Sequence, residues 1–209
     1  MDYLRQLIDR YPALFSVRED IKHAYVLLEE AFTSKGKLLI AGNGGSAADA
    51  EHITGELMKS FVKKRPLPSD FVSHLNEIAP EHAPFLENAI QQGLPVISLS
   101  SHVSLLTACV NDIGADAIYA QQVYGYGNAG DVFMGISTSG NSKNIYYAAL
   151  TAKAKKMPVI ALSGAGGGML GKCADAAIIV PEKETYKIQE LHLPVYHCLC
   201  LMLEEHFFP

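Results

Sequence analysis

The sequence predicts an α/β fold, a three-layer sandwich in which helices cover both faces of a five-stranded parallel sheet, with extra helices at the N-terminus. Short apolar runs rich in strand-forming residues recur along the chain, and most of them are followed by a helical pattern. With 209 residues, the chain is long enough to bury the core of one large domain. The five predicted strands span residues 37–42, 95–100, 131–137, 158–164 and 176–180.

A helix is expected ahead of the first strand. Ser16 and Glu19 have the spacing of a capping box, in which each side chain bonds a free backbone N–H of the other residue. Apolar residues then follow at helical spacing, at Ile21, Tyr25, Leu28 and Phe32. We expect this helix to end near Gly36.

Two later segments differ from the alternating pattern. Residues 62–94 are rich in proline and polar residues, and we interpret them as an insertion with one short helix at about 81–92. The last segment, from about Glu184 to Phe208, is long and amphipathic. Pro194 lies inside it and should kink the helix, because proline lacks a backbone donor. The length fits one large domain, so residues 1–209 are predicted to form a single domain that includes this insertion.

Composition limits the kinds of partner. The net charge is −5, which favours a small polar ligand over nucleic acid. The N-terminal residues mix acids and arginines with apolar residues, and no apolar run reaches membrane-spanning length, so we expect a cytoplasmic protein without a membrane partner. The cysteines show no paired spacing and are expected to be reduced thiols. They are Cys109, Cys173, Cys198 and Cys200.

A glycine-rich turn follows the first predicted strand. Residues 41–52 read AGNGGSAADAEH, with Ser46 as the expected N-cap of the next helix and Asp49 three residues later. Glycines let the backbone approach a ligand closely, and the free N–H groups at a helix start attract anions. The spacing is neither a Rossmann nor a Walker pattern, so a simple tight turn remains the alternative.

A second turn follows the third predicted strand. Residues 135–143 read GISTSGNSK and lie just before a helical pattern. Four hydroxyls beside a helix N-terminus can hold a phosphate without arginine. They belong to Ser137, Thr138, Ser139 and Ser142. An ordinary helix cap with solvated serines is the alternative, but ligands of open α/β sheets bind at this edge.

Several polar side chains could carry chemistry. His52 and Glu56 are four residues apart and project from one helix face, which suits a metal site as well as a simple surface hydrogen bond. The late helix adds more polar groups than its apolar surroundings require. These are Gln189, Glu190, His192 and His197. For each of these two late histidines, the alternative is a buried side chain with its hydrogen bonds satisfied.

Together these stretches resemble the sugar isomerase (SIS) domain family, and within it the bacterial phosphoheptose isomerases, also called sedoheptulose 7-phosphate isomerases. The resemblance runs over nearly the whole chain apart from residues 62–94. It is carried by the motifs GNGGSAADAEH, ACVND, GISTSGNS and IQELH, the last followed by His197. It implies a single SIS domain of flavodoxin-like fold, and a homotetramer whose active sites form where subunits meet.

The resemblance also implies roles for residues at matching positions. Asn43, Gly44 and Gly45, with Asn111 and Asp112, are implied to contact the sugar. The residues implied to hold the phosphate are Ser137, Thr138, Ser139 and Ser142. Those implied to bind a zinc ion are His52, Glu56, Gln189 and His197. Of these four residues, Glu56 and Gln189 are also implied to contact the substrate. Glu56 and His197 are implied to be the catalytic pair.

The activity that the resemblance implies is conversion of sedoheptulose 7-phosphate to D-glycero-D-manno-heptose 7-phosphate through a zinc-assisted enediol. Two alternatives remain open at this point. One is a SIS-domain regulator that binds a phosphosugar or a protein without catalysis. The other is an isomerase of a different sugar phosphate, such as an arabinose or hexulose phosphate.

Overall fold

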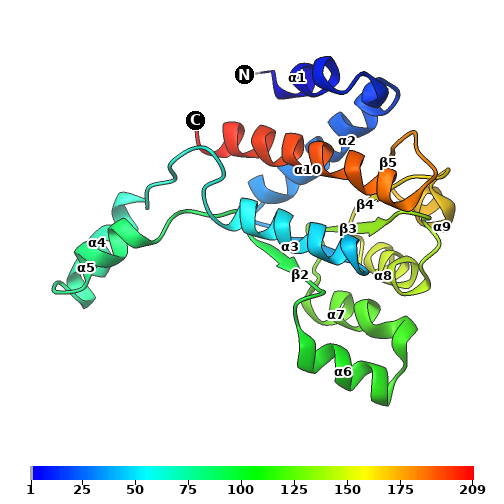
Figure 1. The fold of residues 1–209 in the computed structure, drawn as a ribbon. Coiled ribbons are helices and arrows are strands. Elements are labelled where there is room, and N and C mark those ends of the chain that lie inside the picture. Colours follow the sequence, from blue (N-terminus) through cyan, green and yellow to red (C-terminus); the bar gives the residue numbers. More distant parts are fainter. Residues whose placement is uncertain (1) are drawn as a thin grey trace.

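The computed structural model describes residues 2–209, and its centre is one parallel sheet (Figure 1). The strand order is β2-β1-β3-β4-β5, and every neighbouring pair is parallel. All five predicted strands are confirmed. They are β1 (Leu38–Gly42), β2 (Val96–Ser98), β3 (Val132–Ser137), β4 (Val159–Ser163) and β5 (Ala176–Ile179).

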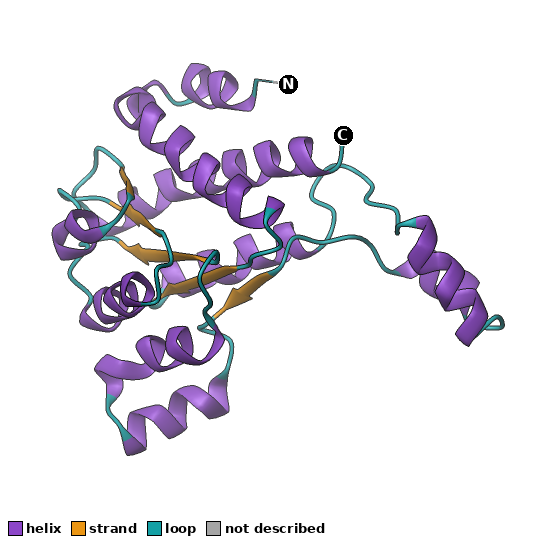
Figure 2. Ribbon diagram, turned by 180° about the vertical axis from the view of Figure 1, so that it is seen from behind, coloured by secondary structure: helices purple, strands orange, loops and turns teal. Residues whose placement is uncertain are grey.

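The sheet is buried on both faces, as its near-continuous apolar strands require. Side chains alternate along a strand, so β1 sends Leu38 and Ile40 into one core and Leu39 and Ala41 into the other. The three-layer fold class is therefore confirmed (Figure 2).

Each face has its own layer of helices. The first layer packs around the core that contains Leu38, and it consists of α1 (Tyr3–Arg10), α2 (Arg18–Thr33), α3 (Gly45–Met58) and α10 (Thr185–Phe207). The second layer packs around the core that contains Leu39, and it consists of α6 (Val103–Asp112), α7 (Ile118–Tyr126), α8 (Lys143–Ala154) and α9 (Gly168–Cys173). Within the part of the chain that the structure describes, none of these helices is long and apolar enough to cross a lipid bilayer.

The helix ahead of β1 begins differently from the prediction. Ser16 lies in a short 3-10 helix, Pro12–Val17, and α2 starts directly after it with Val17 as its N-cap. No side chain caps α2, so the capping box predicted from Ser16 and Glu19 is wrong. The preceding 3-10 turn already leads the chain into the helix. The predicted apolar face is present, because Ile21, Leu28 and Phe32 are buried.

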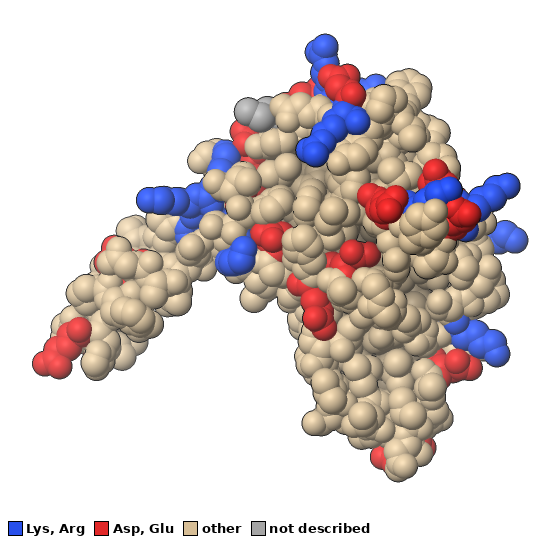
Figure 3. Space-filling view, viewed as in Figure 1, with Lys and Arg blue, Asp and Glu red and all other residues tan. Residues whose placement is uncertain are grey.

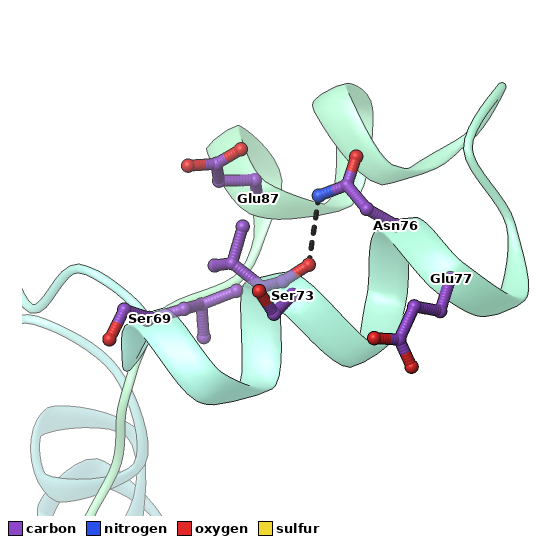
Figure 4. A pocket seen from close by; sticks show the side chains of 7 residues that line it. Ser69, Ser73, Asn76, Glu77 and Glu87 are labelled. Atoms are coloured by element: carbon purple, nitrogen blue, oxygen red, sulfur yellow. Dashed lines mark hydrogen bonds between the residues drawn. The ribbon is translucent and has the colours of Figure 1, made fainter.

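The predicted insertion forms a helical hairpin that projects from the body (Figure 1). The expected short helix is α5 (Ala83–Ala89), and a second helix, α4 (Ser69–Ile78), was missed. No residue of α4 is buried, and Ala83 is the buried residue of α5. Figure 4 shows the open hollow between the two helices, where the side chain of Asn76 donates to the Val72 carbonyl at 2.8 Å. Most of the hairpin surface shown in Figure 3 is uncharged.

The last helix, α10, runs unbroken from Thr185 to Phe207 through Pro194. The helix is therefore not broken at this proline, and the kink stays a prediction. Proline removes a single helical hydrogen bond, and the helix is held in place on both sides because Ile188, Val195 and Leu199 are buried in the core. His197 consequently projects from a continuous helix.

Candidate functional site

The glycine turn joins β1 to α3. Gly44 is the N-cap residue of α3, with φ of 56° and ψ of −120°, a conformation that favours glycine. Ser46 was predicted to be the N-cap, but it lies buried inside the first helical turn, so that prediction is wrong. The backbone at Gly44 makes the turn, and no side-chain cap is needed. Asn43, Gly44 and Gly45 remain exposed at the carboxyl edge of the sheet.

The second turn joins β3 to α8, and two of its hydroxyls are hydrogen-bonded to each other. Ser137 Oγ donates to Ser142 Oγ at 3.1 Å, and Ser139 Oγ accepts from the N–H of Asn141 at 3.2 Å. Thr138 is the fourth of the predicted hydroxyl residues, and its carbonyl accepts from the N–H of Gly164 at 3.1 Å. Ser142 is the N-cap of α8, yet its side chain makes no capping bond. The alternative of an ordinary serine cap therefore does not describe this turn.

A pair of asparagines connects the two turns. The Asn43 amide donates to Asn144 Oδ1 at 2.9 Å, and the Asn144 amide donates back to Asn43 Oδ1 at 3.0 Å. The pair forms because β1 and β3 are neighbours, so the chain leaves both strands at the same edge of the sheet. Asn144 was not predicted as a site residue. Its position two residues after Ser142 does not indicate a site residue unless the order of the strands in the sheet is known.

Helices α3 and α10 pack side by side and run in the same direction. At the start of α3, a Cβ added to Gly45 would lie only 2.6 Å from Gln189 Nε2. Seven residues further along each helix, His52 lies beside Tyr196. Gly45 is therefore the position that leaves room for the Gln189 side chain.

Three of the predicted chemical groups meet further along this helix pair. His52 Nε2 lies 3.2 Å from Glu56 Oε1, and the His197 ring packs edge-on against His52 with ring centroids 5.1 Å apart. Glu56 also lies 3.3 Å from Lys59 Nζ. Burial and the neighbouring His52 lower the pKa of His197, so its imidazole is neutral near pH 7. Its Nε2 is buried without a hydrogen-bond partner among residues 2–209.

Tyr196 links His52 to the half-buried carboxylate of Asp49. Its hydroxyl donates to Asp49 Oδ1 at 3.2 Å and lies 3.0 Å from His52 Nδ1. A hydroxyl has one proton, so if Asp49 takes it, Nδ1 of His52 carries the donor hydrogen. The other nitrogen, Nε2, then points a lone pair at Glu56. Two such acceptors repel unless a proton or a metal cation lies between them.

The donors therefore suit a zinc ion in their chemistry, since imidazole nitrogen and carboxylate oxygen are its common ligands. His52 Nε2, Glu56 Oε1 and the unpartnered His197 Nε2 supply such atoms. Nevertheless, the described residues contain no group of three or more His, Cys, Asp or Glu that could hold a metal as placed. Gln189 lies beside Gly45, eight residues before His197, which is about 12 Å of helix.

The structure does not bring every predicted residue to this cluster. Asn111 and Asp112 are exposed at the end of α6, where the Asn111 amide donates to Asp112 Oδ1 at 2.7 Å. Helix α6 lies at the far edge of the molecule from α3 and α10 (Figure 1). Within one chain, these two residues are thus separate from the His52 cluster.

The other polar residues of α10 behave differently from each other. Glu190 is exposed. His192 is completely buried beside the main chain of Ser163, and burial lowers its pKa to about 4. Neither of its ring nitrogens makes a hydrogen bond of good geometry to the described residues. His192 is therefore a neutral core histidine, but its hydrogen bonds are not satisfied as the alternative assumed.

Comparison with known proteins identifies the family to which this chain belongs. Residues 86–164 match the model of the SIS domain. A phosphoheptose isomerase from Helicobacter pylori is 40% identical over 195 residues, which cover 93% of this chain and 88% of the relative. One from Sulfurimonas denitrificans is 37% identical over 205 residues, covering 98% and 90%. The chain belongs to the phosphoheptose isomerase family of SIS-domain proteins.

Solved structures of phosphoheptose isomerases have the same fold. The enzyme from Francisella tularensis matches with a TM-score of 0.77 and 29% identity, covering 97% of this chain and 95% of the other. The enzyme from Neisseria gonorrhoeae matches with a TM-score of 0.73 and 31% identity, covering 97% and 91%. The resemblance inferred from the turn motifs is therefore confirmed, as is the SIS fold of this phosphoheptose isomerase family member.

Proposed function

We propose that this chain converts sedoheptulose 7-phosphate to D-glycero-D-manno-heptose 7-phosphate in the cytoplasm. Membership of the family makes it an isomerase of sugar phosphates, and the choice of sugar is the proposed part. The observation that carries the proposal is the cluster of His52 and Glu56, on the helix that starts at the glycine turn, with His197 on α10. A protein that only bound phosphosugars would not need the Glu56 carboxylate to lie between the two histidines and Lys59.

Aldose–ketose isomerisation moves one proton between adjacent carbons through an enediol. In the proposed reaction, the Glu56 carboxylate takes the proton from one carbon and returns it to the next. The neutral imidazole of His197 moves a proton between the two substrate oxygens, which suits its lowered pKa. Zinc, which His52, Glu56, Gln189 and His197 would hold, supplies Lewis-acid stabilisation of the enediolate when bound.

The two turns would hold the rest of the substrate. The hydroxyls and backbone N–H groups between Ser137 and Ser142 face the start of α8, which suits a phosphate. Asn43 and the exposed backbone of Gly44 and Gly45 would bind sugar hydroxyls, with Gln189 alongside. Binding energy from the phosphate would orient the reacting carbons over Glu56.

We further propose a homotetramer with active sites at subunit interfaces. Asn111 and Asp112 are exposed on α6, away from the cluster of the same chain. Their implied contact with sugar therefore needs a second subunit to bring them near a site. A mass corresponding to one chain, measured by light scattering at micromolar concentration, would contradict this proposal.

One assay tests the function against both alternatives. Turnover of sedoheptulose 7-phosphate is measured beside arabinose and hexulose phosphates, with zinc present. We expect the heptose phosphate to be the best substrate. Faster turnover of another sugar phosphate would identify that compound as the substrate. No turnover of any of them would favour a non-catalytic binding protein.

A further inference from the structure

A completely buried ion pair lies behind the His52 cluster. Arg65 follows α3 and is 1% exposed, while Glu204 on α10 is 0% exposed. Arg65 Nε donates to Glu204 Oε1 at 2.9 Å, and Arg65 Nη2 lies 2.8 Å from the same oxygen. Neither residue belongs to the predicted site. A buried ion pair contributes little net stability because removing both charges from water is costly, so its presence calls for another role.

The remaining donors of Arg65 reach the end of α3. Nη2 donates to the Glu56 carbonyl at 3.0 Å, and Nη1 donates to the Leu57 carbonyl at 2.7 Å. The last carbonyls of a helix have no partners within it, and α3 has no basic residue in its own last turn. Arg65 therefore supplies both hydrogen bonds and a positive charge at a helix C-terminus. It holds the main chain of the residue whose side chain is the proposed base.

The carboxylate of Glu204 organises the segment between α3 and Arg65. It accepts from the N–H groups of Phe61, Val62 and Lys63 at 2.8, 2.9 and 3.2 Å. The Phe61 ring in turn packs against the His197 ring, with centroids 5.4 Å apart. The same pair is thus connected to both residues of the proposed catalytic pair.

We propose that Arg65, held by Glu204, is a positioning residue for the isomerisation, fixing the last turn of α3 so that Glu56 and His52 keep their geometry. The inference rests on the proposed function for its catalytic consequence. A displacement of the base by about 1 Å can lower turnover about 100-fold, although Arg65 itself touches no substrate. Phe208 packs on the guanidinium at 4.6 Å, which further restricts its movement.

The test is the double variant Arg65→Met with Glu204→Gln. This pair of changes avoids an unpaired buried charge. The one oxygen of Gln can still accept from the N–H groups of Val62 and Lys63, which bond the same oxygen of Glu204. The matched control is Lys37→Met with Asp131→Asn. Lys37 and Asp131 form a 2.6 Å ion pair directly before β1 and β3, and Asp131 likewise accepts backbone N–H groups.

Two readouts are compared at a temperature where both variants are folded. We expect the Arg65 variant to lose about 10- to 100-fold in kcat on sedoheptulose 7-phosphate with little change in KM, while the control keeps the parent values. We also expect faster amide hydrogen exchange over residues 52–58 in the Arg65 variant alone. Equal kcat in the two variants, or unchanged exchange in this segment, would overturn the inference. A parent without turnover would instead refute the proposed function, and the exchange result would still decide whether Arg65 fixes this turn.

Discussion

The Tyr196 hydroxyl lies 3.0 Å from His52 Nδ1, although the two residues are 144 positions apart in the chain. This contact and the bond to Asp49 orient the His52 ring and direct its Nε2 toward Glu56. Partners of this kind are known to influence metal affinity and activity as strongly as some ligands do.

Replacing Tyr196 with Phe should therefore lower turnover and zinc affinity by about 10- to 100-fold, because the ring of His52 loses its hydrogen-bond partner. Zinc affinity is measured by competition with a chelator, and turnover with zinc in excess. Tyr25→Phe is the control, since that hydroxyl bonds Glu29 on α2. Equal losses in the two variants would show that the Tyr196 hydroxyl has no special role.

Glu56→Gln keeps the size of the side chain and removes its basicity. If Glu56 is the base, turnover should fall by roughly 100-fold or more, while the dissociation constant for the sugar phosphate changes much less. The assay is run with zinc in excess, because Gln is a weaker ligand. Unchanged turnover would assign the base to another residue, with His197 the first candidate.

Gly45→Ala should disturb the site with little effect on the fold. The added methyl would lie 2.6 Å from Gln189 Nε2, so this flexible side chain must move away. We expect a higher KM with a nearly unchanged melting temperature. The control is Gly55→Ala in the same helix, where a Cβ meets nothing within 4 Å. That change should stabilise the protein by about 0.5–1 kcal/mol and leave KM as it is.

Ser139→Asp tests the phosphate turn. Ser139 is exposed in the loop between β3 and α8, so the new carboxylate should be tolerated by the fold. Repulsion between two negative charges should weaken sugar-phosphate binding about tenfold or more. Calorimetric titration measures the affinity, with Ser139→Asn as the uncharged control. Parent-like affinity in the Asp variant would place the phosphate elsewhere.

His192 should make the protein less stable in mild acid. Its pKa is about 4 in the folded chain, well below the usual 6.5. Below pH 6.5 the unfolded chain therefore binds a proton that the folded chain does not, and stability falls until about pH 4. From pH 7 to pH 5, this lowers the free energy of unfolding by roughly 2 kcal/mol.

His192→Leu should remove that loss, so urea unfolding at pH 7 and pH 5 should differ less in the variant than in the parent. His74→Gln is the control, because it also removes a histidine but at an exposed position on α4. Identical pH dependence in the parent and the His192 variant would show that this histidine titrates normally.

Much of the fold followed from local patterns in the sequence. Each strand is a short apolar run, and that signal does not depend on the rest of the chain. The signal was weaker for α4, where prolines and charges surround an exposed helix. At the glycine turn, the backbone conformation of Gly44 replaced the side-chain cap expected from Ser46.

The site was only partly predictable for a different reason. The turn motifs are local, so Asn43 and the serines could be found directly. The contact of Tyr196 with His52 depends on how α3 packs against α10. The contact of Arg65 with Glu56 depends on how the following loop folds back on the C-terminal end of α3. A tyrosine in an amphipathic helix or an arginine in a polar loop has no local sequence pattern that predicts such a contact.

Because α3 and α10 form the site together, the site is completed only after α10 has been synthesised. His52 is synthesised 144 residues before Tyr196, which is followed directly by His197. At translation rates of about 5–20 residues per second, roughly 7–30 s separate them. Near the end of that interval the nascent chain holds β1 to β5 but not yet a complete site, so the face of α3 that α10 will cover stays open to chaperones until α10 emerges.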